Sequence, residues 1–102
     1  MANSKLKNER TDLLVRALLS LENEEECYQL LEDLLTIREI RDLSQRLEVA
    51  QMLKSKITYT EIVAATGVST ATIGRVNRCL SYGAGGYELV LQRLEASGDD
   101  KE

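Results

Sequence analysis

The stretch EIVAATGVSTATIGRVNRCL, residues 61–80, decides the fold of this chain. Its first apolar run ends at Gly67, where a turn between two helices would need a left-handed backbone that glycine adopts at little cost. Ser69 follows in a position that suits the N-cap of a second helix. The pattern predicts a helix-turn-helix over residues 58–81, and an ordinary helical hairpin is the alternative.

The second helix of this hairpin has an inner and an outer face. Ile73, Val76 and Leu80 recur at helical spacing and are predicted to face inward, as is Ile62 on the first helix. Small residues at the start of such a helix allow close approach to base edges, and arginine reaches phosphate or guanine. This is typical of a recognition helix in the DNA major groove. Its outer or flanking residues are Thr70, Ala71, Gly74, Arg75 and Arg78.

Charge is unevenly distributed along the chain. The net charge is −4, and residues 1–35 carry 4 basic against 8 acidic side chains. In residues 54–82 four basic side chains stand against one acid, a net of +3. Because the local field governs a partner's approach, an acidic body with one basic segment is compatible with DNA binding that depends on specific contacts.

The remaining sequence predicts further helices, so the fold class is all-α. Leucine-rich helical stripes cover residues 5–54 and include Leu43 and Leu47, and a glycine-rich loop with a short last helix follows at 83–94. Residues 95–102 read as a tail of one single domain, 1–102. The stripes of 5–54 are too apolar for one small monomer, so we expect a homodimer through this region. The residues that support this are Leu13, Leu14, Leu18, Leu30, Leu31, Leu34 and Leu35.

Several classes of function are disfavoured. Histidine is absent, and Cys27 and Cys79 are too far apart for a CxxC pair, so we expect two small buried thiols and neither a catalytic nor a metal site. No phosphate-binding loop or nucleophile motif is present, which predicts that the protein is not an enzyme. Without an apolar run of 18 residues or a signal-like N-terminus, we expect a cytoplasmic protein with no membrane association.

Four strings carry a family resemblance: LLT (34–36), QRLEVAQML (45–53), TYTEIVAATGVSTATIGRVNRCL (58–80) and YGAGGYEL (82–89). Over about residues 10–94 the chain resembles the Trp repressor superfamily, and within it the YerC/YecD-type branch. The resemblance implies a six-helix chain in an intertwined homodimer, with two recognition helices in successive major grooves of double-stranded DNA, roughly 34–36 Å apart. The DNA-facing positions it implies are Tyr59, Thr60, Val63, Thr70, Ala71, Thr72 and Gly74.

The resemblance also implies a candidate effector pocket. The repressor holds the indole of its corepressor between two arginines, which correspond here to Arg75 and to Arg46, or to Gln45 if one residue is gapped. Val76 replaces a glycine and would occupy the space of an indole ring, so tryptophan is disfavoured, and either another small effector or none is expected. The pocket positions implied are Leu35, Thr36, Arg46, Thr72, Arg75, Val76 and Cys79.

These observations predict a dimeric, sequence-specific transcriptional regulator, and by resemblance a repressor. The alternative is a dimeric helical module that binds other proteins and not DNA, which the acidic N-terminal helices favour slightly. No cofactor is expected in either case.

Overall fold

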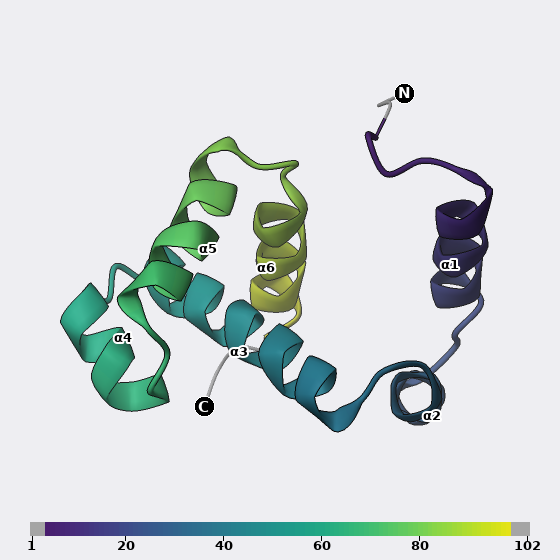
Figure 1. Cartoon of the computed structure of the whole chain (residues 1–102), viewed down its shortest axis with the longest axis horizontal. Coiled ribbons are helices and arrows are strands. Elements are labelled where there is room, and N and C mark those ends of the chain that lie inside the picture. The colour runs from purple at the N-terminus through teal and green to yellow at the C-terminus, as the bar shows by residue number, and fades with distance from the viewer. Residues whose placement is uncertain (1–3, 99–102) are drawn as a thin grey trace. The chain divides into compact units, whose positions relative to one another are not determined.

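A computed structural model describes residues 4–98, which form helices and no strand (Figure 1). This confirms the predicted all-α fold class. The chain divides into two compact units, Met1–Arg38 and Glu39–Glu102, so that nearly all of the third helix belongs with the helix-turn-helix. The helices are α1 (Glu9–Leu19), α2 (Glu24–Leu34), α3 (Ile37–Lys54), α4 (Tyr59–Thr66), α5 (Thr70–Tyr82) and α6 (Gly86–Ser97).

The first unit contains α1 and α2, and an asparagine caps each helix. The Asn8 side chain accepts hydrogen bonds from the backbone N–H groups of Arg10 and Thr11, so α1 begins at Glu9 and not at the predicted residue 5. The Asn23 side chain accepts from the N–H of Glu26 at 2.9 Å, and α2 begins at Glu24. Three glutamates occupy the first turn of α2, where negative charge suits the helix dipole.

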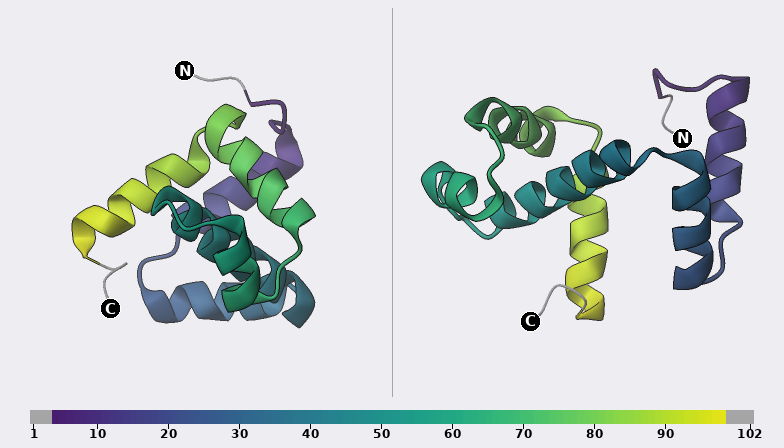
Figure 2. Two further views of the ribbon diagram at one scale, coloured as in Figure 1. Left: turned by 90° about the vertical axis from the view of Figure 1, so that its left-hand side faces the viewer. Right: turned by 60° about the horizontal axis from the view of Figure 1, so that its bottom comes forward.

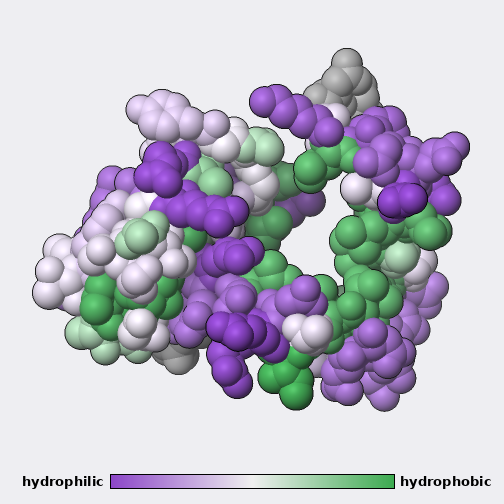
Figure 3. Space-filling model, viewed as in Figure 1, coloured by the Kyte–Doolittle hydropathy of each residue, from purple (hydrophilic) through white to green (hydrophobic). Residues whose placement is uncertain are grey.

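Neither α1 nor α2 contains a buried residue. Leu13 is 61% exposed, Leu18 is 47% exposed and Leu19 is 80% exposed. Hydrophobic surface follows both helices in the space-filling view (Figure 3). The apolar stripes of this unit are therefore present as predicted, but nothing within the described chain covers them fully.

The second unit contains nearly all of α3, together with α4, α5 and α6 (Figure 2), and each of these helices contributes at least one residue to its core. Ile62 and Ile73 are fully buried and join the two helices of the hairpin. Leu43 and Leu47 were predicted to lie on the buried stripe of the third helix, but they are 42% and 43% exposed, because α3 turns Val49 and Ala50 toward the hairpin instead. The core residues are Val49, Ala50, Ile62, Val68, Ile73, Val76 and Leu91.

Both cysteines are exposed, so the prediction of two buried thiols was wrong. Cys27 lies on α2, which has no buried face within this chain. Cys79 lies three residues after Val76, on a side of α5 that the core does not cover. Neither thiol forms a disulfide.

A left-handed lysine ends α3 and directs the chain into the hairpin. The N–H of Ile57 donates to the carbonyl of Met52, and the N–H of Lys56 donates to that of Leu53. These are the two bonds of a Schellman motif, in which the residue at the Lys56 position is usually glycine. Lys56 has φ +67° and is the one non-glycine residue with positive φ in residues 4–98.

Candidate nucleic-acid interface

A capping box begins α4. The Thr58 hydroxyl accepts from the backbone N–H of Glu61 at 3.2 Å, and a Glu61 carboxylate oxygen accepts from the N–H of Thr58 at 3.1 Å. The same carboxylate oxygen also accepts from the Thr58 hydroxyl at 3.1 Å. The single acid of the basic segment is therefore engaged at the helix terminus, next to Tyr59 and Thr60, which are exposed.

The turn between α4 and α5 depends on Gly67 and Thr66. Gly67 has φ +74°, and its N–H donates to the carbonyl of Val63 at 2.8 Å. The Thr66 hydroxyl donates to the carbonyl of Ile62 at 2.7 Å and accepts from the N–H of Val68 at 3.1 Å. Val68, only 7% exposed, thus lies in the angle between the two helices.

Ser69 caps α5 by accepting from the N–H of Thr72 at 3.2 Å. Since α5 buries Ile73 and Val76, its outer side is free of the core. The predicted contact residues divide by exposure into two groups. Val63, Thr72 and Gly74 are half-buried, and the exposed ones are Tyr59, Thr60, Thr70, Ala71, Arg75 and Arg78.

The electrostatic character of α5 differs from that of the chain. Its thirteen residues include Arg75 and Arg78 and no carboxylate. Within residues 4–98 neither arginine forms an ion pair. The first turn of α5 contains no acidic side chain, so no negative charge offsets the positive end of the helix dipole. Together with two guanidinium groups on the outer side of the helix, this positive end attracts an anionic partner such as a phosphate backbone.

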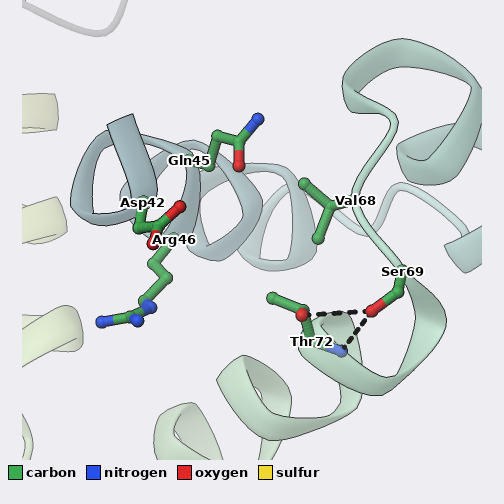
Figure 4. A pocket seen from close by; sticks show the side chains of 6 residues that line it. All are labelled: Asp42, Gln45, Arg46, Val68, Ser69 and Thr72. Atoms are coloured by element: carbon green, nitrogen blue, oxygen red, sulfur yellow. Dashed lines mark hydrogen bonds between the residues drawn. The ribbon is translucent and has the colours of Figure 1, made fainter. Parts of the chain in front are cut away.

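A pocket of about 270 Å³ lies between α3 and the start of α5 (Figure 4). Arg46 and Thr72, two of the predicted effector residues, line it, and so does Gln45, the alternative match for the first arginine. The sequence reasoning missed the other lining residues, although the three- and four-residue spacing of α3 side chains would have found one of them. These are Asp42, Val68 and Ser69.

The other predicted effector residues lie elsewhere. Arg75 is exposed and outside this pocket, Val76 is 2% exposed in the core, and Cys79 is exposed. Leu35 and Thr36 belong to the first unit, whereas the pocket is formed wholly by the second. Within the second unit, then, no two arginines face each other across the pocket.

Two short helices joined by a left-handed glycine turn, with the second helix exposing its outer face, define a helix-turn-helix protein. The family model of the Trp repressor protein matches residues 9–95. The chain therefore belongs to the Trp repressor family, a family of DNA-binding regulators. No helix in residues 4–98 combines the length and the apolar character needed to cross a membrane.

The relatives of the chain agree with this assignment. It is 50% identical over 95 residues to the uncharacterized protein YerC of Bacillus subtilis (strain 168), covering 93% of this chain and 91% of that protein. Crystal structures of a candidate Trp repressor from Staphylococcus aureus and of a TrpR-like protein from Eubacterium eligens ATCC 27750 superpose with TM-scores of 0.84 and 0.85. The identities are 49% and 52%; the alignments cover 89% and 91% of this chain, and 91% and 96% of theirs.

Proposed function

We propose that this protein is a homodimeric, sequence-specific DNA-binding transcriptional regulator that places α5 in the major groove. It represses transcription where its operator overlaps a promoter. The observation that carries the proposal is the outer side of α5, in a chain of net charge −4. It has no acidic residue and two exposed arginines that form no ion pair within residues 4–98. Membership of the Trp repressor family supports it independently.

The geometry of the hairpin supports insertion of α5 by its N-terminal end. Thr70 and Ala71 are small and exposed there, and the Ser69 hydroxyl is turned back to cap the helix. Small side chains let the helix approach base edges and thymine methyl groups closely. Tyr59 and Thr60, exposed at the start of α4, would contact the phosphate backbone on one side of the groove.

The apolar surface of the first unit supports a second copy of the chain as its partner. Leu13, Leu14 and Leu18 are 61%, 42% and 47% exposed, although their spacing places them on one side of α1. Monomeric proteins seldom expose so many neighbouring large apolar side chains. A homodimer would cover this surface and would also present two copies of α5 to two half-sites.

Selection of sheared genomic DNA by the purified protein, followed by sequencing, tests the proposal. The wild-type protein and the Arg75→Ala/Arg78→Ala variant are compared at physiological salt, with Arg93→Ala, an exposed arginine of α6, as the matched control. We expect wild type and Arg93→Ala to recover the same few pseudo-palindromic sites, with half-sites about one helical turn apart. Uniform recovery of the genome by wild-type protein would contradict the proposal.

The exposed apolar face of α1 also favours a second candidate, a helical module that binds other proteins. Light scattering and DNA selection together separate the two. A mass of two chains with specific sites supports the regulator. A stable fold that selects no site, and whose capture of a protein partner survives the double arginine substitution, supports the module.

The proposal includes no tryptophan corepressor. Val76 fills part of the core, and the pocket of the second unit is lined by Asp42, Gln45 and Arg46 with no aromatic side chain. Titration calorimetry with tryptophan should show no binding at micromolar concentrations. Heat with micromolar affinity would overturn this part of the proposal.

A further inference from the structure

Gly74 and Arg78 form a pair on the outer side of α5. A Cβ atom added to Gly74 would lie 3.7 Å from Nη1 of Arg78, so the guanidinium group of Arg78 lies beside residue 74. Helical side chains lean toward the N-terminus of their helix, and residues four apart are neighbours. The guanidinium group of Arg78 therefore lies about one helical turn closer to the N-terminus of α5 than the backbone of Arg78 does.

Glycine is an unfavourable residue in the interior of a helix, so Gly74 calls for a structural reason. Glycine in a helix interior is less favourable than alanine by about 0.5–1 kcal/mol. Gly74 lies in the interior of α5, and no positive φ requires it there. A methyl group at this position would meet Arg78 only at ordinary contact distance, whereas a larger, branched side chain would occupy the space along which the Arg78 side chain lies.

The position of the guanidinium group decides its role in a DNA complex. The first residues of a recognition helix contact base edges, whereas its later residues leave the groove. Arg78 is the ninth of the thirteen residues of α5, yet its charged end lies over the fifth. It is exposed, and no carboxylate of residues 4–98 pairs with it. The N–H groups of the Arg78 guanidinium are thus available near the residues of α5 that would contact base edges.

We propose that Arg78 is a specificity-determining residue that reads a guanine in each half-site, and that Gly74 keeps the path of its side chain open. A guanidinium group donates two parallel hydrogen bonds to O6 and N7 of guanine, which no other base accepts in the major groove. The inference rests on the proposed function.

The test uses the operator recovered by selection. Each guanine is replaced in turn by 7-deazaguanine, which lacks the N7 acceptor, and the affinities of wild type, Arg78→Ala and Arg78→Lys are measured. For wild type we expect one guanine per half-site at which replacement weakens binding roughly ten- to hundredfold. For Arg78→Ala the same replacement should change the affinity less than about twofold, because the donors to guanine are already lost. For Arg78→Lys the replacement should weaken binding less than in wild type, because one flexible ammonium group replaces the fixed pair of donors.

Gly74→Val tests the second half of the inference. Valine fills the space above residue 74 without weakening the helix, since its helix propensity exceeds that of glycine. We expect the variant to lose sensitivity to the same guanine, with a thermal midpoint no lower than that of wild type. In the double variant Gly74→Val/Arg78→Ala, the sensitivity to replacement of that guanine should be little lower than in Arg78→Ala alone.

The outcomes separate this inference from the function on which it rests. If wild-type protein selects an operator and Arg78→Ala discriminates among guanines as wild type does, the role of Arg78 is refuted and the regulator stands. Unchanged guanine sensitivity in Gly74→Val would refute the role of the glycine. If wild-type protein selects no operator, both the function and the inference fail.

Discussion

Nζ of Lys54 lies 3.5 Å from Oε2 of Glu88 and joins the last turn of α3 to the first turn of α6. Oε1 of Glu95, two turns further along α6, is 3.9 Å from the same nitrogen. A cation in the last turn of α3 and an anion in the first turn of α6 each interact favourably with the dipole of their own helix. The charge of Lys54 is thereby offset within the second unit, so the basic character of the hairpin resides in Lys56, Arg75 and Arg78 rather than in all four cations of residues 54–82.

The Lys54–Glu88 pair should contribute modestly to stability. In a double-mutant cycle of Lys54→Met and Glu88→Gln, we expect a coupling free energy of about 0.2–1 kcal/mol, because Glu88 is half exposed and solvent screens the pair. Urea unfolding at low and at high salt measures it, and the coupling should shrink as salt rises. The ion pair between Lys7, which precedes α1, and Asp12 in the first turn of α1, at 2.7 Å, provides a second exposed pair for comparison. Coupling that is unaffected by salt would contradict this account.

Two glycines of the hairpin should respond oppositely to alanine. Gly67→Ala should lower the free energy of unfolding by about 1 kcal/mol or more, because φ +74° disfavours any Cβ although space for it is open. Gly74→Ala should raise it by about 0.5–1 kcal/mol, because its backbone is helical and the new methyl group meets Arg78 only at ordinary contact distance. Denaturant unfolding of the two variants measures the difference, and equal effects would refute the assignment of the turn.

Lys56→Gly should stabilise the protein. The left-handed backbone at Lys56 costs an L-residue about 1–2 kcal/mol, and part of that is recovered with glycine, so a gain of about 0.5–1 kcal/mol is expected. Ser55→Gly, at the preceding position where φ is not positive, should instead be destabilising. Thermal unfolding compares the two. Because the first substitution removes a cation beside α4, we also expect it to weaken DNA binding, and a tighter complex would contradict the proposed interface.

Thr58→Ala should destabilise α4 by about 1 kcal/mol, because the N–H of Glu61 loses its acceptor and the capping box opens. Thr60→Ala is the matched control, an exposed threonine two residues later whose loss should stay within about 0.5 kcal/mol. Urea titrations followed by circular dichroism measure both. Equal losses in the two variants would show that the cap is not responsible.

Core and N-terminal substitutions should reveal the dimer. Ile73→Ala removes a fully buried side chain and should cost about 2–5 kcal/mol. Leu13→Ala removes one that is 61% exposed in a single chain, and should cost little unless a second copy covers it. If the proposed dimer forms, Leu13→Ala should lower the free energy of unfolding about as much as a core substitution does. The unfolding midpoint should then depend on protein concentration. A negligible loss at Leu13 together with a concentration-independent midpoint would contradict the dimer.

The sequence by itself determined the features that arise within a few residues. Ser69 caps its helix where it was predicted, and Gly67 makes the predicted turn, because caps and left-handed turns depend on local backbone groups. The all-α class and the inward direction of Ile62 and Ile73 follow equally from composition and period.

Only the tertiary structure decided which face of each helix is covered. Periodicity marks several apolar faces but not the element that packs on each, so it placed Leu43, Leu47 and Cys79 inside although they lie outside. The polar pocket required α3 and α5 to meet, which brings Asp42 near Ser69 from positions far apart in the chain. The position of the Arg78 guanidinium group over Gly74 depends on a side-chain rotamer, which residue spacing allows but does not specify.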